Sequence, residues 1–360
     1  MYKVSDYINR GVKLANNMLF PRHKRLSTIM LYSTDRCNSK CKHCYIWEKS
    51  PKQHLPFEKI KDIIESPVVD KNTLIGLEGG EFIMHPEAEQ ILEYMVANHP
   101  NFDLLSNAIL ADKLYDLTKK YKPKRLFVSL DGDRKTYKNL RGVDAYDKVI
   151  DSIIRLKEIV PVSIMFTLTN HNDFTDLIHV ADFCKKHDLD MRIGIYNTMD
   201  YFDTNSKEEK SNSLNYKIED IPEIVKDFKE NYDFMALYPQ HREGNLKLSC
   251  NSISDSIVIY PNGDIPICQN KQVILGNIFK EPLHKIINKK STLKLHKQHK
   301  HNCNECWVNY HRKYDIVLYR NLEKVLPKRL VELVLGRYNW SKNHNEKYKD
   351  VVKEDTKRAC

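Results

Sequence analysis

The segment 34-Thr-Asp-Arg-Cys-Asn-Ser-Lys-Cys-Lys-His-Cys-Tyr-45 carries three thiols, Cys37, Cys41 and Cys44, in the spacing C-x3-C-x2-C. A short loop with this spacing can wrap three thiolates around one inorganic centre. A structural zinc ion takes four protein ligands, so three cysteines leave such a site incomplete. On a [4Fe-4S] cluster, three cysteines leave one iron open to a small molecule.

This spacing resembles the signature of the radical S-adenosylmethionine (SAM) superfamily, with His43 where the family usually has an aromatic residue. The resemblance implies that Cys37, Cys41 and Cys44 hold a [4Fe-4S] cluster whose open iron binds SAM. One electron from the cluster then cleaves SAM to a 5′-deoxyadenosyl radical. The alternatives are a chance cluster of cysteines and a structural zinc loop.

Composition limits the other classes of protein. The chain has 360 residues, 41% of them hydrophobic, which suffices for one large core and a smaller module. It has no apolar run near the ~20 residues of a membrane span and no visible signal peptide, so we expect a cytoplasmic protein. Nine cysteines then favour metal ligation over disulfides. The net charge of +10 permits an anionic partner, but a solvated surface explains it better and nucleic acid is not favoured.

Outward from the cysteine segment, short β-rich runs alternate with longer helical ones. Strands are predicted at Leu26–Ser33, Thr73–Leu77, Phe102–Ser106, Arg125–Leu130, Ser163–Leu168 and Asp190–Tyr196, with helices starting near Phe57, Pro86, Ala111, Tyr146 and Asp173. This alternation predicts an α/β fold with a parallel sheet and chemistry at the C-terminal ends of its strands. The resemblance narrows it to a partial (β/α)6 TIM-like barrel, although alternation alone fits other α/β folds.

Four regions follow from this pattern: an N-terminal amphipathic helix (1–25), the barrel (26–235), a second module (240–312), and a C-terminal helix and tail (313–360). The basic residues of the first helix would also suit peripheral contact with an anionic membrane. A polar run over 199–217 predicts a surface loop or lid, and a helix is expected over Glu219–Tyr232. The last twenty residues are expected to be disordered.

Three further motifs fall where the family places SAM contacts. Gly79-Gly80-Glu81 follows the second strand and resembles the GGE motif, whose backbone oxygens and glutamate accept hydrogen bonds from the SAM ammonium group, although Phe82 replaces the usual proline. Ser129 ends the fourth strand in Ser-Leu-Asp-Gly, and Arg141-Gly142 follows. The resemblance places Ser129 and Arg141 near the ribose and carboxylate of SAM. Asn107 resembles the T-N-G turn, although Ala108 replaces its glycine.

A second set of cysteines, Cys250, Cys268, Cys303 and Cys306, lies in the second module. Four thiolates complete the ligand set of either a [4Fe-4S] cluster or a zinc ion. The arrangement resembles the auxiliary-cluster region called SPASM in its shortened, twitch form, as in the SAM-dependent dehydrogenase of 2-deoxy-scyllo-inosamine. Full SPASM regions carry two more cysteines where this chain has Arg312 and Ile316, so we expect no second auxiliary cluster. Pro261-Asn-Gly-Asp264 predicts a β-hairpin turn before Cys268.

The leading hypothesis is a radical SAM oxidoreductase that removes a hydrogen atom from a small molecule of polyol, sugar or nucleoside type and passes an electron to the auxiliary cluster. A flavodoxin- or ferredoxin-type reductant is the expected electron source. Asp200, Tyr201 and Asp203 on the polar loop are candidate bases. One alternative is a maturase of a ribosomally made peptide, disfavoured because no leader-binding domain is apparent in the N-terminal region. Another is a non-catalytic zinc or iron–sulfur protein that binds nucleic acid.

Overall fold

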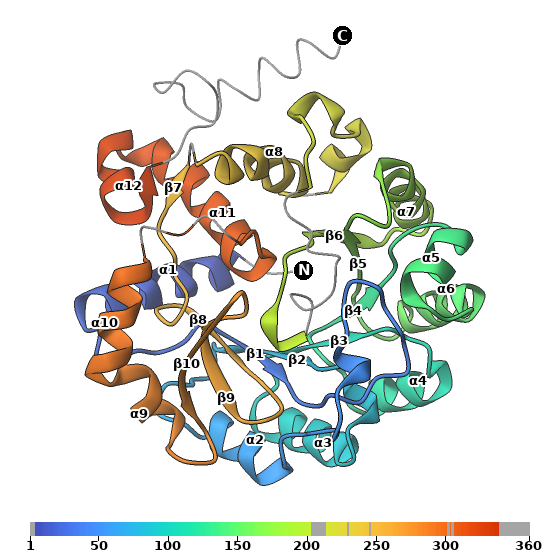
Figure 1. The fold of residues 1–360 in the computed structure, drawn as a ribbon, viewed down its shortest axis with the longest axis horizontal. Coiled ribbons are helices and arrows are strands. Elements are labelled where there is room, and N and C mark those ends of the chain that lie inside the picture. Colours follow the sequence, from blue (N-terminus) through green and yellow to red (C-terminus); the bar gives the residue numbers. More distant parts are fainter. Residues whose placement is uncertain are drawn as a thin grey trace.

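A computed structural model of the chain describes residues 4–202, 214–228, 230–244, 246–300, 303 and 306–337. A curved sheet of seven parallel strands crosses its centre in the order β6-β5-β4-β3-β2-β1-β8 (Figure 1). The strands are β1 (Thr28–Tyr32), β2 (Leu74–Glu78), β3 (Phe102–Ser106), β4 (Arg125–Ser129), β5 (Val162–Leu168), β6 (Asp190–Ile195) and β8 (Ser256–Ile259). The six strands predicted from the sequence are confirmed to within two residues at each end, and so is the partial barrel.

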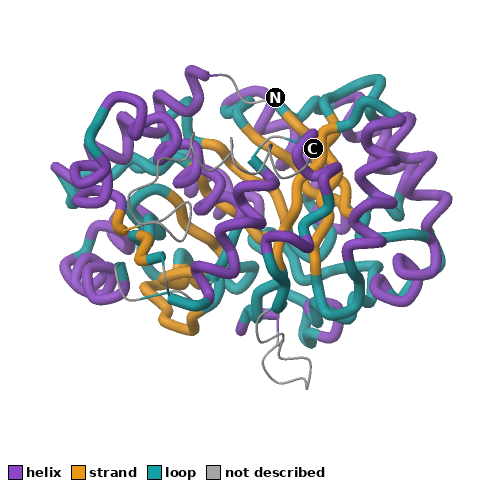
Figure 2. The backbone as a smooth tube through the Cα atoms, turned by 90° about the horizontal axis from the view of Figure 1, so that it is seen from above, coloured by secondary structure: helices purple, strands orange, loops and turns teal. Residues whose placement is uncertain are grey.

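Helices on the outside of the sheet connect its strands, as the view from above also shows (Figure 2). They are α2 (Phe57–Ile64), α3 (Ala88–Asn98), α4 (Ala111–Lys120), α5 (Arg134–Arg141), α6 (Tyr146–Leu156) and α7 (Phe174–Lys186). In α6, Val149, Ile153 and Leu156 recur at helical spacing and are fully buried. The start of α7 is fixed by Asp173, whose carboxylate accepts bonds from the backbone N–H groups of the first turn. The sequence pattern did not predict α5.

The second module contributes to the same sheet, because β8 pairs in parallel with β1 from Thr28↔Ser256 to Leu31↔Ile259. The hairpin of this module is β9 (Asp264–Cys268) with β10 (Lys271–Asn277). The Pro-Asn-Gly-Asp turn does form, with Gly263 at a φ of 81°, but it joins β8 to β9, which are not ladder partners. The predicted turn is confirmed, with Gly263 N donating to Tyr260 O at 2.8 Å and Tyr260 N donating to Asp264 O at 3.0 Å, but no strand ladder extends beyond it. Helices α9 (Leu283–Asn288) and α10 (Lys290–His299) complete the module.

The N-terminal helix α1 (Val4–Leu19) and helix α11 (Asn309–Val325) pack together beside the barrel. The rings of Tyr7 and Tyr314 stack with their centroids 6.3 Å apart, and Arg10 is ion-paired with buried Asp255. The C-terminal region forms two helices, α11 and α12 (Lys328–Leu335), followed by β11 (Gly336–Arg337), which pairs with β7 (Lys247–Leu248). The predicted tail lies outside the described residues.

The helix predicted over 219–232 is wrong. The chain there makes two 3-10 turns, Ile218–Asp220 and Glu223–Asp227, and the helix α8 begins later, at Asn231–Arg242. Pro222 explains the interruption, because the residue before a proline avoids the helical conformation. The polar run contains a 3-10 turn, Asp200–Phe202, together with 203–213, which are outside the described residues.

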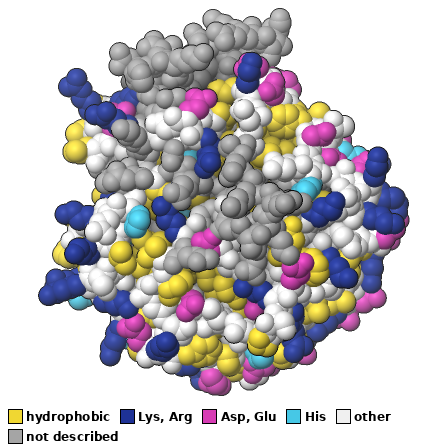
Figure 3. All heavy atoms as spheres, in the orientation of Figure 1, with side chains coloured by type: hydrophobic (Ala, Val, Ile, Leu, Met, Phe, Trp, Pro, Cys, Tyr) yellow, Lys and Arg dark blue, Asp and Glu magenta, His cyan; other side chains and the backbone are white. Residues whose placement is uncertain are grey.

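The structure bears on two sequence-based expectations, the absence of a membrane-spanning helix and the solvated positive surface. Among the described helices, none combines the length and apolar character needed to cross a membrane. On the face drawn in Figure 3, Lys and Arg side chains are scattered, mostly along the rim, with acidic side chains between them. That distribution matches a solvated surface on this face.

Candidate active site and second cysteine site

The cysteine segment leaves the C-terminal end of β1 and is held by two neighbouring parts of the barrel. The last turn of α5 presents carbonyls to it: Lys40 N donates to Arg141 O at 2.9 Å, and Lys42 N donates to Leu140 O at 2.9 Å. On the other side, Glu81 N donates to Arg36 O at 2.7 Å. The loop is thus fixed by backbone bonds to segments that the sequence analysis connected with SAM.

Gly79 and Gly80 are required by this packing. An added Cβ at Gly79 would lie 2.8 Å from Thr34 O, and one at Gly80 would lie 2.4 Å from Arg36 O. The two glycines therefore let the end of β2 approach the cysteine loop itself. The sequence analysis attributed them to the approach of a ligand; their contact with SAM stays a prediction.

The three thiols line one end of a cavity of about 460 Å³ that runs through the barrel to Thr28 and Leu74 at the opposite strand ends. Burial raises the pKa of Cys37 to about 12, and the neighbouring Cys41 and Glu81 add to the rise. Burial also raises the pKa of Cys44, with further rises from Cys41 and Cys37. The three thiols are thus close enough to influence one another, and without a metal centre their burial favours the neutral, protonated form.

These residues fit an iron–sulfur cluster. In the described ranges, no three His, Cys, Asp or Glu side chains gather closely enough to hold a single metal ion. A [4Fe-4S] cluster takes one thiolate on each iron, so its cysteines need not meet at one point. Around Cys41, Ser39 Oγ lies 3.2 Å and Arg141 Nη1 lies 3.6 Å from the sulfur, and such polar contacts tune a cluster.

Glu81 is tied to the end of the third strand. Its buried carboxylate accepts a bond from Ser106 Oγ at 2.8 Å and another from Asn107 N at 2.7 Å. Burial nevertheless raises the pKa of Glu81 to about 7. The Asn107 side chain donates to Asn38 Oδ1 at 2.8 Å, so it supports the cysteine loop. Ala108 has a φ of 57°, the left-handed conformation for which the T-N-G turn normally supplies glycine.

Arg141 is buried and faces the cavity, where Ser129 also lies. Its guanidinium is ion-paired with Asp131, which is fully buried and accepts a further bond from Thr167 N at 2.7 Å. Its Nε has no hydrogen-bond partner. A buried cation with one free donor is suited to a carboxylate or to an anionic cluster.

His43 borders the cavity, with its ring 6.1 Å from that of Tyr196. Burial and the nearby Arg141 lower the pKa of His43 to about 3, so the imidazole is neutral at physiological pH. Its Nδ1 is buried without a hydrogen-bond partner. The site thus offers a flat neutral ring beside the thiols.

Two of the three candidate bases, Asp200 and Tyr201, are described, and both lie apart from the lining of the cavity. Tyr201 donates to Asp35 Oδ1 at 2.8 Å and stacks on Tyr260 at 4.0 Å. Neither it nor Asp200 lines the cavity, whereas their neighbours Met199 and Phe202 do. Asp203 is outside the described residues. The catalytic roles of all three stay predictions.

The second set of cysteines comes together from distant parts of the module. Burial raises the pKa of Cys268 well above its ordinary value, and Cys306, Cys250 and Cys303 add to the rise. Cys250, Cys303 and Cys306 are therefore close enough to Cys268 to change its pKa, and the ligands of one shared cluster must lie close together in this way. Of the remaining cysteines, Cys184 is fully buried in α7, and Cys360 lies outside the described residues.

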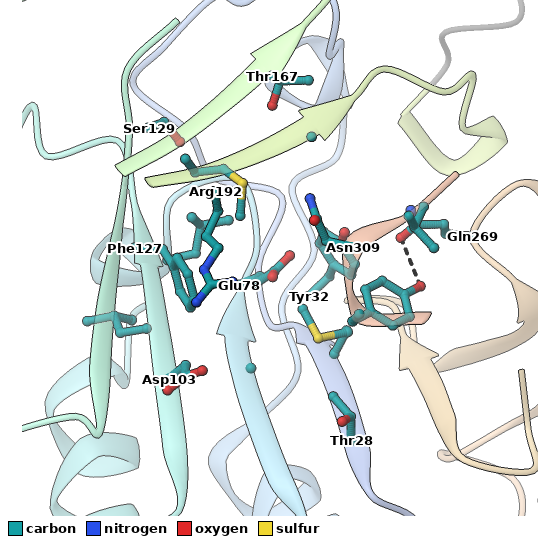
Figure 4. Close-up of a pocket in the computed structure, with 18 of the residues that line it drawn as sticks. Thr28, Tyr32, Glu78, Asp103, Phe127, Ser129, Thr167, Arg192, Gln269 and Asn309 are labelled. Carbon is teal, nitrogen blue, oxygen red and sulfur yellow. Dashed lines mark hydrogen bonds between the residues drawn. The ribbon is translucent and has the colours of Figure 1, made fainter. Parts of the chain in front are cut away.

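The cavity reaches from the first set of cysteines to the chain neighbours of the second. Gln269 and Trp307, the neighbours of Cys268 and Cys306, line it opposite the first site. Within it, Tyr310 donates to Gln269 Oε1 at 3.2 Å. Figure 4 shows Glu78 and Arg192 directed into its middle from opposite strands.

Sequence reasoning missed Glu78, which ends β2 immediately before Gly79. Its carboxylate is hydrogen-bonded to the hydroxyl of Tyr32. Burial raises the pKa of Glu78 to about 7 despite this bond, and nearby Asp103 adds to the rise. The available signal was positional, because an acidic residue in the inward register of a barrel strand faces the lumen.

Comparison with known families identifies both halves of this site. Residues 31–184 match the radical SAM superfamily, and residues 250–307 match the iron-sulfur cluster-binding domain called SPASM. The chain therefore has a radical SAM domain followed by a SPASM domain. Radical SAM domains bind SAM and a [4Fe-4S] cluster, and SPASM domains bind auxiliary iron–sulfur clusters, so the chain takes both cofactors.

Individual relatives are more distant. The chain is 27% identical over 273 residues to the antilisterial bacteriocin subtilosin biosynthesis protein AlbA of Bacillus subtilis (strain 168), covering 71% of this chain and 58% of that protein. It is 28% identical over 167 residues to the Fe-coproporphyrin III synthase of Methanosarcina barkeri (strain Fusaro), covering 44% of this chain and 41% of that protein. The chain thus spans about half the length of these two relatives.

Solved structures share the fold. Streptococcus suis SuiB bound to SAM superposes with a TM-score of 0.61 at 16% identity, over 82% of this chain and 74% of that one. The enzyme anSMEcpe with bound SAM and Cp18Cys peptide gives a TM-score of 0.53 at 16% identity, over 86% of this chain and 99% of that one. At these identities the likeness establishes the architecture alone.

Proposed function

We propose that this enzyme is a maturase that oxidatively modifies a peptide. The observation that carries the proposal is the single cavity that reaches from the first set of cysteines to the neighbours of the second. Among the similar proteins, AlbA is a bacteriocin biosynthesis protein, SuiB has been solved with its precursor peptide SuiA, and anSMEcpe has been solved with a peptide. These relatives favour a peptide over the small molecule expected from the sequence.

The residues of the chain divide the work around this cavity. When bound, SAM and its cluster supply a 5′-deoxyadenosyl radical, and the second cluster supplies an electron acceptor. Cys37, Cys41 and Cys44 would hold the first cluster, with Gly79 to Glu81, Ser129, Arg141, Asn107 and His43 around SAM. The second set of cysteines would hold the auxiliary cluster. A flavodoxin- or ferredoxin-type protein is the proposed reductant.

The proposed oxidation also needs a proton acceptor. Removal of a hydrogen atom and then of an electron from a peptide leaves one proton to be taken up. Glu78 lines the cavity and points toward its middle, and we propose it as the acceptor. A pKa of about 7 suits this role, because a base near neutrality is both available and able to hold the proton.

The test is anaerobic co-expression with the small peptides encoded beside the gene, followed by mass spectrometry. We expect one of them to lose two hydrogen atoms in a single linkage or double bond. The control is Cys37→Ala, which should lower the iron content from about eight to about four per chain and abolish 5′-deoxyadenosine formation. A wild-type enzyme that cleaves SAM but oxidises only polyols, sugars or nucleosides would overturn the peptide assignment.

A further inference from the structure

A buried arginine takes the place of a missing cluster ligand beside the second set of cysteines. Arg312 lies six positions after Cys306 in the first turns of α11, where a full SPASM region would continue with a cysteine. Its side chain is only 3% exposed. A guanidinium so far from water requires compensating charge nearby.

The contacts of Arg312 surround Cys250. Arg312 Nη1 donates to Ser249 O at 3.2 Å and to Asp315 Oδ2 at 2.9 Å. The other oxygen of Asp315 accepts a bond from Asn251 Nδ2 at 3.1 Å. Ser249 and Asn251 are the residues on either side of Cys250, so the Arg312–Asp315 pair contacts a backbone carbonyl before this ligand and a side-chain amide after it.

The charge of Arg312 is only partly satisfied by these contacts. Its Nε is buried without a hydrogen-bond partner. Burial lowers the pKa of Arg312, but Asp315 and, after it, Cys306 and Cys250 raise it above its ordinary value, so the guanidinium is charged. The arrangement repeats that of the first site, where Arg141 is ion-paired with a buried aspartate, contacts Cys41 and also has an unpartnered Nε.

We propose that Arg312 tunes the second cluster, its buried positive charge stabilising the reduced state and raising the reduction potential, while Asp315 partly offsets this charge. When the cluster gains one electron, its charge becomes more negative by one unit. A fixed cation nearby favours that change, and a fixed anion opposes it. The proposal rests on the auxiliary-cluster assignment made above and names the residues that set its redox poise.

The test is a redox titration of the second cluster, followed by electron paramagnetic resonance. The full chain carries Cys37→Ala, Cys41→Ala and Cys44→Ala, so that only the second cluster is present. We expect Arg312→Gln to lower the equilibrium constant for one-electron reduction at least tenfold, which corresponds to 59 mV. Asp315→Asn should shift it in the opposite direction, and Arg312→Lys should shift it less than Arg312→Gln.

Controls separate tuning from folding. Arg125→Gln also removes a buried, ion-paired arginine, but from β4, and should leave the potential unchanged. If Arg312→Gln fails to load iron, the Asp315→Asn variant is the deciding measurement. A raised reduction potential of the second cluster in that variant supports the proposal, and an unchanged potential overturns it. Full iron content with an unchanged potential in Arg312→Gln, or shifts of the same sign in both variants, would also overturn it. A second site that takes zinc refutes the cluster assignment instead.

Discussion

Replacing Glu78 with glutamine should stabilise the protein, and increasingly so as the pH rises. The pKa of Glu78 is raised from its ordinary 4.5 to about 7, chiefly by burial. The folded protein therefore binds this proton more tightly than the unfolded chain does. The associated stability is fully present below about pH 4.5 and is lost as the pH rises through 7. Glutamine keeps the shape and an acceptor for the Tyr32 hydroxyl but carries no charge.

The size of the effect follows from the shift. A difference of about 2.5 pKa units corresponds to about 3 kcal/mol once both states are ionised. At about pH 8, Glu78→Gln should thus unfold with a free energy about 3 kcal/mol above that of the wild type. At about pH 5.5, which is about one pH unit above the pKa of Glu78 in the unfolded chain, the carboxyl is ionised only in the unfolded state. The gain in free energy of unfolding should then fall to about 1 kcal/mol.

The assay is anaerobic urea denaturation of both proteins at the two pH values, followed by circular dichroism. The matched control is Glu89→Gln, since the carboxylate of Glu89 lies on the surface in an exposed ion pair with Lys120. Its effect should be small at either pH, because water and salt screen an exposed ion pair. A difference between Glu78→Gln and wild type that is the same at both pH values would refute the raised pKa, and with it the argument that Glu78 serves as a base near neutrality.

The remaining predictions concern the frame of the first site. Gly80→Ala should cost about 2 kcal/mol and lower the iron content in anaerobic reconstitution, since its Cβ would overlap a carbonyl of the cysteine loop. Gly11→Ala, whose Cβ would meet only a tyrosine hydroxyl at 3.3 Å, should leave the iron unchanged; equal iron loss in both would contradict the packing argument. Asp131→Asn should cost about 3 kcal/mol in urea denaturation, because it leaves a buried guanidinium unpaired. Asp147→Asn, in an exposed ion pair, should cost less than about 1 kcal/mol, and a similar loss in both would show that burial is not the cause.

The parts that the sequence predicted are those set by local pattern. Strand positions follow from short apolar runs, and the cluster ligands follow from cysteine spacing. The pairing of β8 with β1 was missed because it joins residues more than 200 positions apart, and no local pattern encodes it. Helix α5 was missed because its eight residues are mostly polar, and α8 was placed too early because Pro222 interrupts the apolar periodicity.

Site residues divide in the same way. Glu81, Asn107 and Arg141 were identified by motif, yet their contacts with Ser106, Asn38 and Asp131 depend on how neighbouring strand ends meet. Glu78 belongs to no motif, and only its place in the barrel shows that it faces the cavity. In the sequence, Arg312 was noted only because it stands where a full SPASM region has a cysteine.

The repeated Arg–Asp pairs explain how a barrel can bury two anionic clusters close to one substrate. An arginine alone would neutralise a cluster, but its long side chain could also turn toward the substrate or toward water. A buried aspartate on the far side of the guanidinium fixes its orientation, at the cost of part of its charge. Asp131 and Asp315 both occupy this position, and each leaves one Nε unpartnered. Because the same pairing occurs at two sites on unrelated elements, we infer that it serves the proposed clusters.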